Sequence, residues 1–87
     1  MPVRERNMTR PTITPSELGA LVRGAHKAQG LRQDELAGVA GVGLRFIVEL
    51  EGGKPTVQLG KVLRVLETLG CGLTITTPSE QEPGGKP

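Results

Sequence analysis

The first apolar stripe of the chain lies between residues 18 and 25 and has the spacing of an amphipathic helix. Its apolar positions, at i, i+3, i+4 and i+7, are Leu18, Leu21, Val22 and Ala25. Thr14 and Glu17 fit a capping box around Pro15, and Gly30 is suited to end the helix. The residues expected to lie away from the stripe are Arg23, His26, Lys27 and Gln29. We therefore predict a first helix that begins at Pro15 and ends before Gly30.

The next segment has the spacing of a helix-turn-helix. Gln33, Ala37, Gly41 and Ile47 occupy relative positions 1, 5, 9 and 15. A small residue at Ala37 lets two helices pass closely, and Gly41 allows a turn with positive φ. We predict helices over about 33–40 and 43–51, with Ile47, Val42 and Leu50 facing the core and the pair Gly52-Gly53 as the stop. The outer face of the second helix, which fits the major groove of DNA, then carries Leu44, Arg45, Val48 and Glu49.

A fourth helix is predicted after Thr56, which is a good N-cap, and Gly70 ends it. Its apolar stripe is wide, which suggests burial on more than one side and places part of the helix at a subunit interface. Residues 73–77 then alternate apolar and β-branched polar side chains, as strands do. A single strand in a helical monomer lacks a backbone partner, so we expect it to pair with a second copy. The residues assigned to dimerisation are Val65, Leu69, Leu73, Thr74, Ile75, Thr76 and Thr77.

The chain of 87 residues is long enough for one small domain, whose core must be aliphatic because there is one Phe and no Tyr or Trp. We divide it into a flexible basic arm at 1–13, a DNA-binding domain at 14–77 and a disordered Gly- and Pro-rich tail at 78–87. The arm has no periodicity, and its cations either track DNA or remain solvated. They are Arg4, Arg6 and Arg10.

Charge and rare residues exclude several classes of function. The net charge of +2, from 11 basic and 9 acidic residues, does not by itself argue for nucleic acid. Cys71 is the single cysteine, so no intramolecular disulfide forms, and a structural role is expected for it. No membrane span or signal peptide is present, which indicates a cytoplasmic protein. With one His and no phosphate-binding loop or metal-ligand cluster, we expect no enzyme, cofactor or metal.

The stretch from Leu18 to Ile75 resembles the phage-repressor-like (Xre/Cro) helix-turn-helix family. The matching runs are Leu31–Ala37, Gly41-Val42 and Ile47–Thr56. Within that family it looks most like the HipB-type antitoxins, on the Thr-Pro-Ser-Glu-Leu start of the first helix and the exit of the fourth helix into a short strand. The resemblance implies an all-α, four-helix domain whose short C-terminal β-strand pairs across a homodimer. It also implies repression of its own operon and neutralisation of a HipA-like serine/threonine kinase toxin.

The resemblance assigns contacts to double-stranded DNA. Gln33 would bond a phosphate, with Arg32, Lys27 and Lys54 as further phosphate contacts, and solvated surface charge is the alternative for these cations. Arg45 would bond guanine bidentately, and Leu44 and Val48 would pack on a thymine methyl. Glu49 either accepts from cytosine or orients Arg45, and Phe46 either packs at the core edge or contacts sugar-phosphate or the toxin. The full set is Arg32, Gln33, Gly43, Leu44, Arg45, Phe46, Val48, Glu49 and Lys54.

One pair departs from the family's pattern. An Arg at the buried edge of the first helix there often pairs with the Glu that ends the third helix, and here the two positions hold His26 and Glu51. We expect this pair to form, to be weaker than an Arg–Glu pair and to depend on pH around neutrality.

The function expected is therefore that of an autoregulating antitoxin repressor that binds a palindromic operator as a homodimer. Two alternatives remain open. One is a stand-alone repressor of the same family, and the other is a helix-turn-helix interaction module that does not read DNA.

Overall fold

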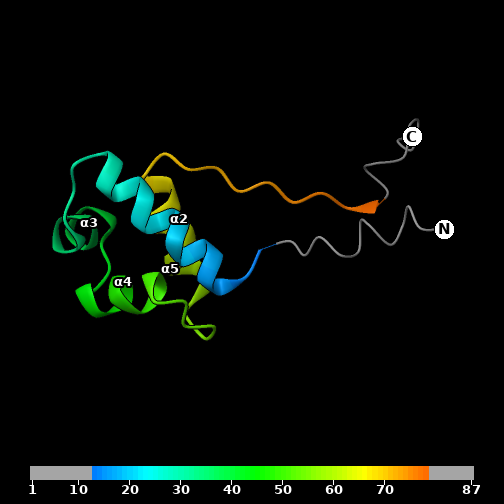
Figure 1. The fold of residues 1–87 in the computed structure, drawn as a ribbon, viewed down its shortest axis with the longest axis horizontal. Helices are drawn as coiled ribbons and strands as arrows, with labels where there is room; N and C mark the ends of the chain where they lie inside the picture. The colour runs from blue at the N-terminus through cyan, green and yellow to red at the C-terminus, as the bar shows by residue number, and fades with distance from the viewer. Residues whose placement is uncertain (1–12, 79–87) are drawn as a thin grey trace.

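The structure is a computed structural model, and it describes residues 13–78. Four helices, labelled as in Figure 1, make up the folded part: α2 (Pro15–Ala28), α3 (Gln33–Ala40), α4 (Leu44–Glu51) and α5 (Leu59–Thr68). The all-α architecture expected from the sequence is confirmed for this part of the chain. None of the helices in it is long and apolar enough to cross a membrane. The basic arm and most of the C-terminal tail, at residues 1–12 and 79–87, lie outside the described residues.

Helix α2 begins as predicted, and its predicted apolar stripe faces the core except at Leu21, because Val22 is buried and Leu18 and Ala25 pack against the core. Thr14 is its N-cap, and the capping box is complete, because the Glu17 amide donates to Thr14 Oγ1 (3.1 Å) and the Thr14 amide donates to the Glu17 carboxylate (3.0 Å). Leu21, expected in the core, is 61 % exposed, whereas His26, expected outside, is buried. The cause is Gly19, whose missing side chain lets the end of α4 approach this face of the helix.

The helix-turn-helix unit of α3 and α4 matches the prediction closely. Gly41 ends α3 in the left-handed conformation (φ 74°, ψ 33°), and its amide donates to the Ala37 carbonyl (3.0 Å). Ala37 and Ile47 are buried where the two helices pack. Gly43 is the N-cap of α4 rather than its first residue.

Helix α5 differs from the prediction in its start and in its buried face. It begins at Leu59 with Gln58 as N-cap, not after Thr56, because Val57 packs against the core from the preceding loop. The sequence pattern assigned Val65 and Leu69 to a dimer interface. Both are instead buried in the chain's own core, at 0 % and 5 % exposure, so they do not form a free face for a partner. The exposed apolar residues of α5 are instead Leu59 (66 %) and Leu63 (42 %).

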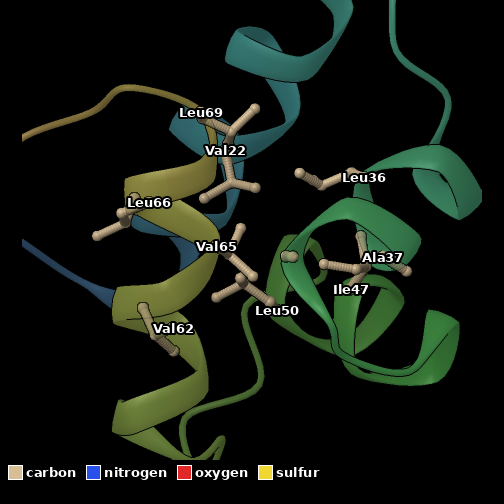
Figure 2. Packing of buried hydrophobic residues seen from close by; sticks show 10 residues of the cluster. Val22, Leu36, Ala37, Ile47, Leu50, Val62, Val65, Leu66 and Leu69 are labelled. Carbon is tan, nitrogen blue, oxygen red and sulfur yellow. The ribbon is translucent and has the colours of Figure 1, made fainter.

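The hydrophobic core lies between the helices, and Figure 2 shows its aliphatic side chains converging from all four helices. A hydrogen bond joins the C-terminal ends of α2 and α5, because the Gln29 side-chain amide donates to the Leu69 carbonyl (2.8 Å). The core contains Val22, Leu36, Ala37, Ala40, Ile47, Leu50, Val62, Val65, Leu66 and Leu69.

The segment predicted as a strand runs away from the helices in Figure 1. No strand is assigned between residues 13 and 78, and Leu73 (53 %) and Ile75 (74 %) are exposed. A strand requires a second strand for its backbone hydrogen bonds, and none is assigned among the described residues. The pairing across a dimer therefore stays a proposal.

Candidate nucleic-acid interface

The outer face of α4 is formed by the four residues that the sequence pattern placed there. Ile47 and Leu50 anchor the helix in the core at 0 % and 2 % exposure, so the opposite face is turned to solvent. Leu44 and Val48 are each 48 % exposed, and the Arg45 side chain is 88 % exposed. The helix therefore presents two apolar contacts and a guanidinium on one side, with Glu49 beside them.

Glu49 is paired with two cations on this surface. Its Oε2 lies 3.4 Å from Arg45 Nε, one helical turn away, and 3.3 Å from Lys54 Nζ in the loop after α4. Of the two roles left open for Glu49, the orientation of Arg45 is the one seen in the free chain. The contact with Lys54 is a feature that the sequence did not predict.

A second charged group lies at the start of α3. The exposed Arg32 side chain contacts Asp34 (3.0 Å) and Glu35 (3.4 Å), and its amide donates to Glu35 Oε1 (2.9 Å). The hydrogen bond from Arg32 holds the pKa of the Asp34 carboxyl below its ordinary range, and the same bond raises the pKa of the Arg32 guanidinium. Arg32, expected at a DNA phosphate, is thus bound to carboxylates of its own chain.

A buried polar chain connects α2, α4 and the start of α3. His26 Nδ1 donates to the Leu31 carbonyl (2.8 Å), and His26 Nε2 lies 2.9 Å from Glu51 Oε2. The second oxygen of Glu51 accepts from the Gln33 side-chain amide (2.9 Å). The predicted His26–Glu51 pair is therefore present, and no local pattern indicates that it would also hold Gln33.

Two further contacts connect α5 to the helix-turn-helix of α3 and α4. Phe46 is half-buried at the core edge, with Lys61 Nζ 5.7 Å from its ring centroid, so the packing role left open for it is the one observed. Arg64 donates to the carbonyl of Gly41 (3.2 Å), the residue at the turn of the motif. Neither Lys61 nor Arg64 was singled out in the sequence, because both contacts cross 15 or more positions along the chain.

Within residues 13–78, no group of His, Cys, Asp or Glu side chains could hold a metal ion. Cys71, partly buried, packs against the core, as a structural cysteine does.

Comparison with known proteins gives both a relative and a fold. The chain is 65 % identical, over 74 residues, to the HTH-type transcriptional regulator y4mF of Sinorhizobium fredii (strain NBRC 101917 / NGR234). That match covers 85 % of this chain and 97 % of the relative. No protein-family model matches the chain.

Two solved structures share the fold. They are described as a HipB-O4 20mer complex and as a HipA-HipB-O2-O3 complex, and each superposes with a TM-score of 0.69 at 20 % identity. Each covers 79 % of this chain and 97 % of its own. The likeness to the first confirms that the helix-turn-helix architecture expected from the sequence is of the HipB kind.

These findings agree with the exposed α4 face and with the expectation that the chain is not an enzyme. Because it is 65 % identical to y4mF over 85 % of its length, the chain belongs to the family of HTH-type transcriptional regulators.

Proposed function

We propose that the chain is a sequence-specific DNA-binding repressor that reads its operator through α4. The observation that carries this proposal is the exposed face of α4, on which Arg45 projects at 88 % exposure beside Leu44 and Val48. A guanidinium bonds O6 and N7 of guanine bidentately, and the two apolar side chains suit thymine methyl groups. Such a contact is worth about 1–3 kcal/mol of discrimination between bases.

Phosphate contacts would supply most of the affinity and would come from both sides of the reading helix. Gln33 is the first residue of α3, and a helix start favours an anion, although its side chain would have to exchange Glu51 for the phosphate. Lys54 lies in the loop after α4, and its side chain is 47 % exposed. Arg32 precedes α3 and would exchange its carboxylate partners for phosphate.

A homodimer would place two reading helices about 34 Å apart on a palindrome. The support for it is the pair of exposed apolar residues Leu73 and Ile75, which alternate with threonines in a segment suited to a two-stranded ribbon. Because Val65 and Leu69 are buried in the core, we assign the helical part of the interface to Leu59 and Leu63. Deletion of residues 72–87 should give a monomer and weaker DNA binding, whereas deletion of 79–87 alone should change neither. If the chain that lacks residues 72–87 still sediments as a dimer, the two-stranded ribbon is contradicted.

We further propose that this repressor acts as an antitoxin that neutralises a HipA-like kinase and regulates its own operon. The support is the shared fold with HipB in the HipA-HipB-O2-O3 complex, together with the resemblance of the start of the first helix. Co-expression with the product of the neighbouring gene tests it. Co-purification and relief of growth arrest would support the antitoxin, and a neighbour without kinase-like sequence would favour the stand-alone repressor.

DNA reading is tested by a gel shift on the DNA just upstream of the chain's own gene at two salt concentrations. Arg45→Ala should abolish the specific shift, and Arg45→Lys should keep the salt dependence but lose selectivity, because lysine lacks the planar fork. Absence of a specific shift with the wild-type chain would favour the interaction module without DNA reading.

A further inference from the structure

Four residues form the exposed face of α4, and Glu49 is the acidic one among them. One of its carboxylate oxygens contacts two cations. Oε2 lies 3.4 Å from Arg45 Nε and 3.3 Å from Lys54 Nζ. The Glu49 side chain is itself only 32 % exposed, whereas those of Arg45 and Lys54 are 88 % and 47 % exposed. The carboxylate therefore lies beneath the two cations that a DNA backbone would meet first.

The same pairing occurs at the other end of the surface. Arg32 is bound by Asp34 and Glu35, so Arg32, Arg45 and Lys54 each have a carboxylate partner in the free chain. Binding to DNA of any sequence comes from cations that neutralise phosphates and release counterions. A surface whose cations are already paired gains less binding free energy from each phosphate contact, because the phosphate must displace a carboxylate.

The geometry at Arg45 separates a base from a phosphate. Glu49 holds the Nε edge of the guanidinium, and the terminal nitrogens at Nη1 and Nη2 carry further N–H donors. Those donors match the O6 and N7 acceptors of guanine, which is neutral and does not compete with the carboxylate. A phosphate is an anion and would be repelled by Glu49 as it approaches the same guanidinium.

We propose that Glu49 is a specificity-determining residue, which suppresses non-specific DNA binding by holding Arg45 and Lys54 while leaving the guanine-facing edge of Arg45 free. This inference rests on the proposed DNA-reading function. It assigns to Glu49 a role in rejecting wrong DNA rather than a contact with cytosine.

The test is the variant Glu49→Gln, measured by fluorescence anisotropy on the upstream DNA and on an unrelated duplex of equal length over a series of salt concentrations. Freeing two cations should tighten non-specific binding and steepen its log–log salt slope by about 1–2. The ratio of specific to non-specific affinity should fall about tenfold.

Asp34→Asn is the matched control, because it makes the same change in net charge at another ion pair. Arg32 retains Glu35 in that variant, so the salt slope should change by about 1 at most and the specificity ratio by less than about twofold. Circular dichroism melting of both variants checks that the fold is kept.

The outcomes separate the two proposals. A wild-type chain that does not distinguish the upstream DNA from the unrelated duplex overturns the proposed function and this inference with it. If the wild-type chain distinguishes the two duplexes, but the ratio of specific to non-specific affinity changes equally in Glu49→Gln and Asp34→Asn, or in neither, the role of Glu49 is overturned. The DNA-reading function is then left standing.

Discussion

His26 and Glu51 form a buried pair that joins α2 to the end of α4. Nε2 of the imidazole lies 2.9 Å from Oε2 of the carboxylate, and the two side chains are 5 % and 4 % exposed. His26 Nδ1 faces the Leu31 carbonyl at the same time (2.8 Å), so only the protonated ring offers a donor to both acceptors. The pair thus fixes the loop between α2 and α3 as well as the end of α4.

Removing one partner of this pair should be strongly destabilising. Glu51→Ala leaves the imidazole facing an empty site and frees the Gln33 amide, so we expect a loss of about 3–5 kcal/mol in the free energy of unfolding. Urea denaturation measures it, and Glu67→Ala on the exposed face of α5 is the control, with an expected change within about 0.5 kcal/mol. A loss for Glu51→Ala no larger than that of the control would contradict the importance of the pair.

Replacing His26 with arginine should raise the melting temperature. A guanidinium stays charged at every accessible pH and has enough donors for both Glu51 and the Leu31 carbonyl. In a domain of this size, each kcal/mol gained corresponds to about 4–8 °C. Differential scanning calorimetry of His26→Arg checks this expectation, and an unchanged or lower melting temperature would show that the imidazole already fits the site as well as arginine does.

Gly19 is required by the approach of α4. A Cβ at this position would lie 2.7 Å from the Glu51 carbonyl oxygen, closer than real Cβ contacts, and the atom in the way belongs to the backbone. Gly19→Ala should therefore cost about 1–3 kcal/mol as the helices are pushed apart. Gly24, on the same helix with nothing within 4 Å of its Cβ position, is the control and should gain about 0.5–1 kcal/mol as Gly24→Ala. Equal effects of the two changes on thermal unfolding would disprove the close approach.

The Arg32–Asp34 pair predicts an acid-side loss of stability. The pKa of the Asp34 carboxyl is lowered in the folded chain by the hydrogen bond from Arg32, so the pair's contribution is fully present above the ordinary aspartate pKa. The contribution is lost as pH falls through the depressed value, where the folded carboxyl takes up its proton. Carboxyl-carbon NMR titration should place the Asp34 midpoint below that of an unpaired aspartate. Arg32→Gln should return it towards the ordinary range, and a midpoint that does not move would refute the pairing in solution.

The sequence alone determined the elements that depend on local rules. The capping box at Thr14 and the left-handed Gly41 are set by a few neighbouring side chains, and both are present as predicted. The outer face of α4 was also predictable, because a helix of eight residues with Ile47 and Leu50 in the core has only one face left for Arg45.

Tertiary structure decided which residues of α2 and α5 are buried, and against what. Periodicity placed Leu21 in the core and His26 outside, but the absence of a side chain at Gly19 lets α4 approach a different face. Similarly, Val65 appeared available to a second subunit, and only the packing of α3 against α5 shows that one chain already covers it. Apolar spacing records that a face is buried, but not what buries it.

The long-range polar contacts that hold the helix-turn-helix also required the folded chain. Glu51 meets Gln33 across 18 positions, and Arg64 meets the Gly41 carbonyl across 23, so no local pattern announces either contact. The segment at 73–77 is the opposite case, because its alternation is plain in the sequence, while no strand is assigned to it among the described residues. Local chemistry thus specified the helix-turn-helix and the ion pairs on its surface, and long-range packing specified how the outer face of α4 is held in place.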